Sequence, residues 1–300
     1  MITIFKTTPN YNFLAKAKPF VILSICLVLI SAGSIIFSGL KLGLDFRGGT
    51  EALVSFEQSL DIPDLKASLE SAFETSVSVV PSGSDRNLLI SFYKEDISDV
   101  QALLKAELSK KSSAFEILEL GSIGPKIGAQ IKENAWYTIL ISLALVLVYM
   151  SFRFNFQFGI GAIVALLHDA FITVGAFSLF QIEFDLTALA GILTLIGYSL
   201  NDSIVIIDRV RENIKRHPSK SLFDQINLSV NETLSRTILT FGTTLVIILA
   251  MFIWGGESIQ GFSFSFLVGI VVGTYSSVFV ASPVAIFIES RLRKPTEEMA

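Results

Sequence analysis

The sequence predicts an α-helical polytopic membrane protein with six transmembrane helices and one extracytoplasmic α+β domain of ferredoxin-like type. Of its 300 residues 51% are hydrophobic and the mean hydropathy is +0.63, which is too apolar for a soluble fold of this size. Six apolar runs are each long enough to cross about 30 Å of hydrocarbon as a helix. One long stretch between the first two runs, residues 41–133, is rich in charged residues, and its acidic side chains outnumber its basic ones.

The six runs are separated by short polar segments, except for that long stretch. The first run follows Lys6, Lys16 and Lys18, as a signal peptide would, but it is longer than a signal core and is interpreted as a retained anchor. The predicted spans are residues 20–40, 135–152, 159–180, 186–207, 237–254 and 262–288.

Basic residues predict the orientation. Lys and Arg concentrate in residues 1–19, after the second and fourth spans, and in residues 291–300, whereas the short loops on the other side carry only Glu183, Asp185 and Glu257. The excess of basic residues in cytoplasmic loops places both termini in the cytoplasm and residues 41–133 outside. Spans two to six then form one membrane domain over residues 134–290.

The external stretch alternates strand and helix patterns in the order βαββαβ. Strands are expected at 51–56, 76–80, 87–93 and 115–120, with a hairpin turn at 81–84. One helix is expected at 61–73 and a second after Asp96, which can act as its N-cap.

Ionisable residues inside spans are costly and therefore become functional candidates. Asp202 lies in the polar stretch Gly197-Tyr198-Ser199-Leu200-Asn201-Asp202-Ser203, and Tyr198 precedes it by one turn on the same face. A carboxylate there can be neutral or charged according to its surroundings, as a proton carrier requires. The alternative is an Asp that reaches interfacial water, because the run ends close by.

Arg236 begins the fifth span and has two interpretations. It satisfies the positive-inside rule and can extend to the interface, but Thr240, Thr243 and Thr244 continue its face as a polar stripe into the membrane. The stripe suits a hydrated path or a contact between helices.

His168 and Asp169 lie in the third span. As neighbours they point about 100° apart on a helix, so the prediction is that they do not pair with each other but bond to neighbouring helices, with a proton relay as the alternative. They supply two metal ligands at most, and the single cysteine, Cys26, adds neither a metal site nor a disulfide. No metal site is therefore expected.

Two further motifs consist largely of small residues. The sixth span has a small residue at every fourth position, including Gly269, Gly273 and Ser277, which predicts close helix packing. After the first span, Gly48 and Gly49 permit a tight turn, and Asp45 and Arg47 are candidates to pin the external domain to the membrane. The spacing does not fit a phosphate-binding loop.

Five segments together resemble the SecD/SecF family of protein-export membrane proteins, which is related to the resistance-nodulation-division transporters. They are 43–50 (GLDFRGGT), 121–125 (GSIGP, with Gly124 and Pro125), 197–213 (GYSLNDSIVIIDRVREN), 235–245 (SRTILTFGTTL) and 273–282 (GTYSSVFVAS).

The resemblance implies a subunit in the bacterial inner membrane that assembles with SecD and YajC and acts with the SecYEG channel on a translocating preprotein. SecA would drive the ATP-dependent step of translocation, and the proton-motive force would drive the step that follows it. It assigns proton conduction to Asp202 and Arg236 and implies no enzyme activity and no cofactor beyond the coupling proton.

Other classes fit less well. A proton-coupled small-molecule exporter of the same superfamily would need a second six-span half, and an intramembrane hydrolase a Ser-His or paired-Asp centre or a zinc motif. No strongly basic tract favours a nucleic-acid partner.

Overall fold

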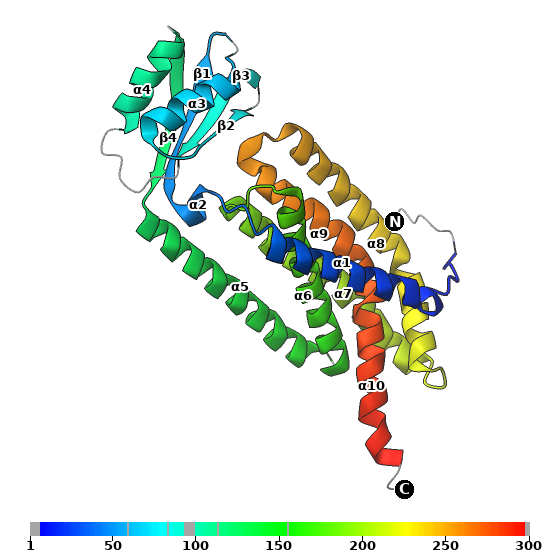
Figure 1. Cartoon of the computed structure of the whole chain (residues 1–300). Helices are drawn as coiled ribbons and strands as arrows, with labels where there is room; N and C mark the ends of the chain where they lie inside the picture. Colours follow the sequence, from blue (N-terminus) through cyan, green and yellow to red (C-terminus); the bar gives the residue numbers. More distant parts are fainter. Residues whose placement is uncertain are drawn as a thin grey trace.

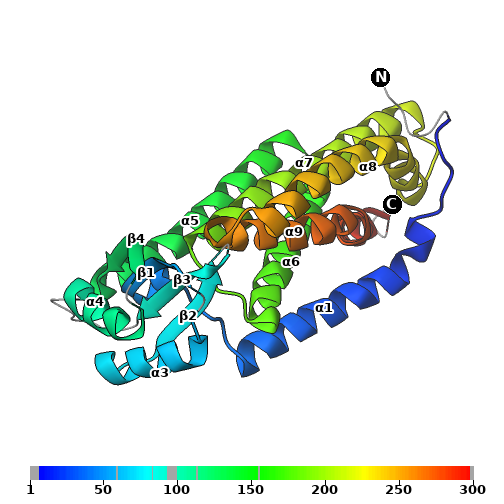
Figure 2. The same cartoon turned by 90° about the horizontal axis from the view of Figure 1, so that it is seen from above.

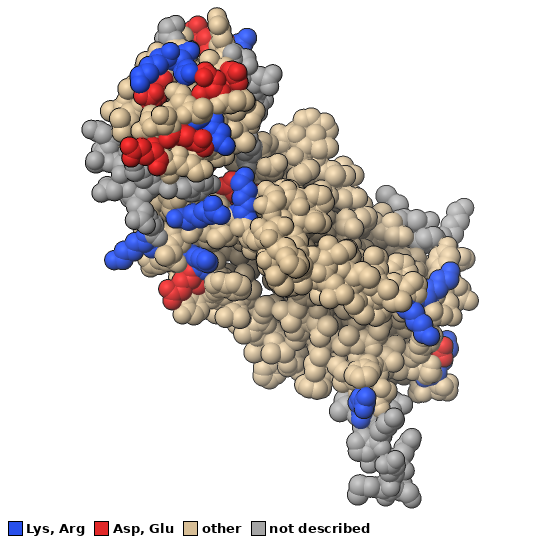
Figure 3. Space-filling view, in the orientation of Figure 1, with Lys and Arg blue, Asp and Glu red and all other residues tan. Residues whose placement is uncertain are grey.

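The computed structural model describes residues 7–58, 60–82, 84–92, 100–112, 114–154 and 156–297. A bundle of long helices carries a small α+β domain at one end (Figures 1 and 2). Charged side chains gather on that domain and at the opposite end, and the surface between them is almost free of them in this view (Figure 3). This distribution is typical of a chain whose middle lies in hydrocarbon.

The described residues contain six candidate membrane spans, as predicted. They are α1 (Ala17–Phe37), α5 (Pro125–Arg153), α6 (Phe156–Phe180), α7 (Leu186–Arg216), α8 (Leu222–Trp254), and α9 (Gln260–Phe279) continued by α10 (Ala281–Glu297). Short 3₁₀ turns, η1 (Leu14–Lys16) and η2 (Glu257–Ile259), precede α1 and α9.

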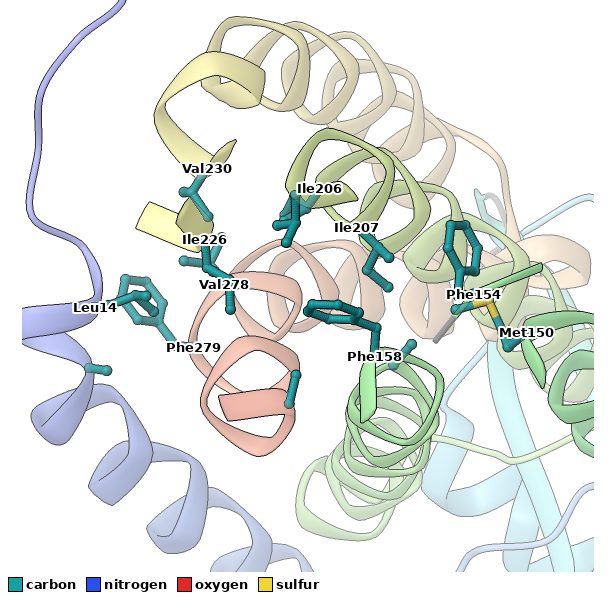
Figure 4. Packing of buried hydrophobic residues seen from close by; sticks show 14 residues of the cluster. Leu14, Met150, Phe154, Phe158, Ile206, Ile207, Ile226, Val230, Val278 and Phe279 are labelled. Carbon is teal, nitrogen blue, oxygen red and sulfur yellow. The ribbon is translucent and has the colours of Figure 1, made fainter. Parts of the chain in front are cut away.

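Helices α7 and α8 extend well beyond the apolar runs that predicted them. Hydropathy marked 207 and 237 as the ends of these spans, but the helices continue to Arg216 and begin at Leu222. Their extensions are amphipathic: Val210 of α7 belongs to the same cluster as Ile226 and Val230 of α8. Figure 4 shows that Ile206 and Ile207, at the end of the predicted run, lie in this cluster too. A one-sided apolar pattern has low mean hydropathy, which is why the runs ended early.

The predicted last span at 262–288 is present within Gln260–Arg291, but its helix is interrupted at one residue, Val280. Helix α9 ends at Phe279 and α10 begins at Ala281. Pro283 lacks an N–H and its ring would clash with the carbonyl of Phe279 in a regular helix. The ring of Phe20 stacks on Phe279 at this break, with centroids 3.9 Å apart.

The external domain has the predicted βαββαβ order. Its elements are β1 (Gly49–Phe56), α3 (Ile62–Phe73), β2 (Val77–Ser82), β3 (Ser84–Phe92), α4 (Val100–Lys111) and β4 (Phe115–Ile123). The sheet is antiparallel throughout, in the order β2-β3-β1-β4. Alternate strand residues such as Val54 and Ile90 are buried against Leu69 and Leu104 of the two helices. The predicted cap Asp96 lies outside the described residues.

Helix α5 begins at Pro125, directly after β4, so the predicted domain boundary at 133 falls inside a helix. Proline suits the first helical position because it needs no N–H partner there. Gly124 is the N-cap, with extended backbone.

The inner layer of the bundle consists of α6, α7 and α9, whereas α1, α5 and α8 bury few residues within the chain. Small residues allow the inner helices to approach closely. A Cβ at Gly269 would overlap the side chain of Leu195, and one at Gly273 would lie 3.1 Å from the Cβ of Ser199. The small-residue face of the last span thus lies against α7 of this chain, and Ser277 lines a cavity of about 20 Å³ beside Ser203.

Candidate functional site

Asp202 sits inside the bundle in the middle of α7. Its residue is 4% exposed, and its Oδ2 atom makes no hydrogen bond. The hydroxyl of Ser203 beside it is likewise buried and unbonded. A buried carboxylate oxygen without a donor is costly, so this group is poised to gain a proton or a new partner.

Arg236 lies on α8, opposite Asp202. The two charges interact electrostatically, yet they form no ion pair within 4.0 Å. Tyr198 faces the hydroxyls of Thr240 and Thr244 without a hydrogen bond of ordinary geometry. The structure therefore brings together four predicted residues, Asp202, Arg236, Tyr198 and Thr240, across the α7–α8 contact.

A cluster of polar residues fixes α8 one turn before Arg236. Glu232 accepts hydrogen bonds from Arg209 Nε and Asn213 Nδ2, each at 2.7 Å, and Asn213 also donates to Ser229 at 3.0 Å. Arg209 and Asn213 belong to the DRVREN part of the third motif, which sequence reasoning did not assign a role. They hold the two helices in register below Asp202.

Several polar residues of α7 and α8 lie on the outer surface of the chain. On α7 the exposed residues Thr194, Gly197 and Asn201 follow helical spacing, and on α8 so do Arg236 and Thr243. Asn201 thus points away from the interior that holds Asp202. This chain therefore covers the inner side of the site, at Asp202, and leaves its outer side, at Asn201 and Arg236, exposed.

The prediction that His168 and Asp169 do not pair is wrong. His168 Nδ1 lies 2.9 Å from Asp169 Oδ1, because rotation about their χ angles turns the two side chains toward each other from adjacent positions. The expected bonds to other helices also exist: Asp169 Oδ2 accepts from Ser199 of α7 at 2.7 Å and from Ser276 of α9 at 2.8 Å.

The other side of His168 extends the network to α1. Its Nε2 atom lies 3.2 Å from the hydroxyl of Tyr275, which lies 3.1 Å from the hydroxyl of Ser24. One buried network thus joins α1, α6, α7 and α9. Ser199, Tyr275 and Ser276 belong to the segments that resemble the family, but no local pattern predicts that they meet Asp169.

The glycine pair Gly48 and Gly49 forms the entry to the external domain. Both have positive φ, 76° and 138°, and a Cβ at Gly49 would overlap the carbonyl oxygen of Phe92. A Cβ at Gly128 in α5 would lie 2.9 Å from the backbone nitrogen of Gly48. Thr50 pairs with Ser122 across β1 and β4, so segments 43–50 and 121–125 lie side by side. Asp45 and Arg47 lie just before the glycine pair in the short helix α2 (Leu44–Arg47).

Carboxylates cluster around this entry. Burial raises the pKa of Glu51, a hydrogen bond from Ser91 opposes the shift, and the nearby charges of Glu183, Asp45 and Glu119 add to it. Burial also raises the pKa of Asp185, against hydrogen bonds from Ala188 and Thr187.

Replacing Glu51 by Gln is expected to stabilise the protein slightly at neutral pH. An acid whose folded-state pKa is raised stabilises the fold at low pH, and that stability is lost as pH rises through the raised value. Because Glu51 is partly exposed, the gain should be small, about 1 °C in the midpoint of thermal unfolding. Unfolding of the purified chain in detergent at pH 7 and at about pH 4 checks this, since the difference should vanish at the lower pH. An equal shift at both pH values would contradict it.

Comparison with known proteins decides the family. The model of the SecD/SecF C-terminal region matches residues 103–291, and that of the SecD/SecF GG motif matches residues 33–59. The chain belongs to the SecD/SecF family. Protein translocase subunit SecF of Rhodothermus marinus is 40% identical over 94% of this chain and 94% of its own length. SecF of Haemophilus influenzae is 41% identical over 92% of this chain and 86% of its own.

The match to SecF subunits makes this chain a SecF-type subunit of a protein translocase, a multi-pass membrane component of a transporter and not an enzyme. The crystal structure of SecDF from Thermus thermophilus, a translocon-associated membrane protein, superposes with a TM-score of 0.85 at 33% identity. A second SecDF structure, in a super-membrane-facing form, gives 0.74. The chain covers 40% of the length of the first SecDF chain, of which it matches one part.

Proposed function

We propose that this chain, with a SecD-type partner, uses a proton gradient to promote polypeptide export through the SecYEG channel. The carrying observation is Asp202, a buried carboxylate with an unbonded oxygen that faces Arg236 without an ion-pair contact. Protonation removes the attraction between the two groups, so the α7–α8 contact has two states that differ by one charge.

The energy available matches such a change. Moving one elementary charge across the membrane yields about 2.3 kcal/mol per 100 mV. This biases a two-state helix contact by roughly 50-fold, since 1.36 kcal/mol corresponds to a factor of ten. Asn201, Tyr198 and Thr240 line the path in this proposal, and His168 and Asp169 hold the helices around it.

A partner is needed to complete the site. Asn201 and Arg236 are exposed on the outer face of α7 and α8, where hydrocarbon would be a costly neighbour. A second membrane half that covers this face removes the cost, and the SecDF chain of Thermus thermophilus is longer than this one, which covers 40% of it. The remaining partners, YajC, SecYEG and SecA, and a bacterial inner-membrane location with cytoplasmic termini follow from the family resemblance and the basic loops.

The test uses inverted membrane vesicles that contain the chain, its SecD-type partner, SecYEG and SecA. A secreted precursor is first inserted with ATP, and completion of its translocation is then followed without ATP. We expect completion to depend on the gradient and to fall to the level of vesicles lacking this chain when an uncoupler is added. Unchanged completion with uncoupler would refute the proton coupling. Co-purification from mild detergent should also recover a SecD-type protein, whereas its absence would contradict the proposal that such a partner completes the site.

A further inference from the structure

Two chain segments meet at the external end of the bundle. Residues 41–48 lead from α1 into the external domain, and residues 181–186 lead from α6 into α7; we call their contact the joint. Phe184 N donates to Lys41 O and Gly43 N donates to Phe184 O, both at 2.8 Å. The rings of Phe46 and Phe184 stack with centroids 5.8 Å apart.

Asp45 connects the joint directly to α7. Its Oδ2 atom accepts a hydrogen bond from Leu186 N at 2.9 Å, across 141 positions of sequence. Leu186 is the first residue of α7, whose amide has no partner within the helix. Asp185 accepts from Ala188 N at 2.7 Å, so two carboxylates cap the same helix end, where the helix dipole favours negative charge.

The backbone on both sides of Asp45 is closely packed against other elements. A Cβ at Gly43 would lie 3.1 Å from the Cβ of Asp185, and on the other side Gly48 and Gly49 are packed against α5 and β3 as described above. Glu51 of β1 lies close enough to Asp45 and Glu183 for their like charges to repel, so this contact does not hold the joint together. The backbone hydrogen bonds of the joint and the cap from Asp45 fix the start of the domain to the start of the helix that carries Asp202.

We propose that Asp45 is a positioning residue that fastens the external domain to α7, so that the two move as one rigid unit. The proposal rests on the proposed function, because it is the proton-dependent displacement of α7 that the joint would transmit. The joint stays closed throughout the cycle, and the motion occurs at the contacts of α7 with α8.

Replacement of Asp45 supplies the first test. In Asp45→Ala the capping acceptor is lost, so hydrogen exchange in the segment 182–188 of the full chain should quicken by about tenfold, and gradient-driven translocation should fall by a similar factor. Asp45→Asn keeps an oxygen acceptor and should stay within about twofold of wild type in both. Asp61→Ala is the control, because Asp61 precedes α3 without a side-chain cap bond.

A reversible crosslink supplies the second test. Gly43→Cys with Asp185→Cys places two Cβ atoms close to disulfide distance after a shift of a few tenths of an ångström, in a background where Cys26 is replaced by Ser. The oxidised and reduced forms share the same substitutions, so they differ only in the disulfide between positions 43 and 185. We expect the oxidised form to translocate as well as the reduced form does in the presence of the gradient. When Asp45→Ala is added to the same two cysteines, oxidation should restore the translocation that Asp45→Ala removes.

The outcomes separate the two proposals. Loss of gradient-driven translocation on oxidation would show that the joint must open, and full activity of Asp45→Ala would show that it is not needed; either overturns the rigid joint. If instead wild-type translocation ignores the uncoupler, the proposed function fails, while the exchange experiment still reports on the cap.

Discussion

Asp202→Asn is expected to abolish gradient-driven translocation while leaving the protein at normal abundance in the membrane. Asn has nearly the shape of Asp but cannot change charge, so the contact with Arg236 no longer has two states. If one coupled proton supplies about 2.3 kcal/mol per 100 mV, its loss lowers the driven step by roughly 50-fold. The measurement is translocation into vesicles with and without uncoupler, at equal amounts of protein.

The matched control is Asp208→Asn on the same helix. Asp208 lies near the far end of α7 and forms a half-exposed ion pair with Arg153 at 3.1 Å, which contributes little to stability. It should behave as wild type. A fully active Asp202→Asn variant would leave Arg236 and Asp202 as a structural pair and remove the basis of the proton mechanism.

Arg236 offers a complementary variant in the same assay. Arg236→Lys keeps a cation on α8, whereas Arg236→Ala removes it, so the first should retain more of the gradient-driven activity than the second. Because Lys presents a compact charge on a flexible stem and Arg a planar fork, partial activity of the Lys variant indicates that charge matters more than geometry.

The membrane architecture was largely predictable because its signals are local. Long apolar runs marked all six spans, and alternation of apolar residues marked the four strands of the external domain. The ends of α7 and α8 were missed because Ile207, Val210 and Ile226 form a one-sided pattern among charged neighbours. The break after Phe279 had a local signal in Pro283, but an apolar run conceals it.

The site was predictable only in part, since helix crossings cannot be read from one sequence. Asp202 and Arg236 stood out because charges inside spans are rare. Ser199, Tyr275 and Ser276 did not, because small polar residues are common in membrane helices and their role arises only where α6, α7 and α9 meet. The prediction for His168 and Asp169 was wrong because it assumed that each side chain points straight out from the helix axis. Rotation about the χ angles can bring the side chains of adjacent residues into contact.

Asp169→Ala is expected to destabilise the chain more than other single changes in the bundle interior. Asp169 is 1% exposed and contacts three groups, so its removal leaves the hydroxyl of Ser199 and the Nδ1 atom of His168 without this partner and Ser276 with the carbonyl of Gly273 alone. Hydrogen bonds between membrane helices average about 0.6 kcal/mol, while stranded buried groups cost about 1–3 kcal/mol each, which gives a loss of about 2–5 kcal/mol. Detergent-induced unfolding of the purified chain measures it.

The variant Asp169→Asn distinguishes a structural role of Asp169 in this network from a role in proton transfer. The Asn oxygen can still accept from both serines, and its NH₂ group can donate to His168 Nδ1 if the imidazole carries its proton on Nε2 and donates it to Tyr275. The network is then rebuilt without a titratable carboxyl, and the unfolding free energy should fall by only about 1 kcal/mol. If this variant also keeps gradient-driven translocation, Asp169 serves to hold four helices together. If it is stable but inactive, the proton path runs through His168 and Asp169 of α6 as well as through Asp202 of α7.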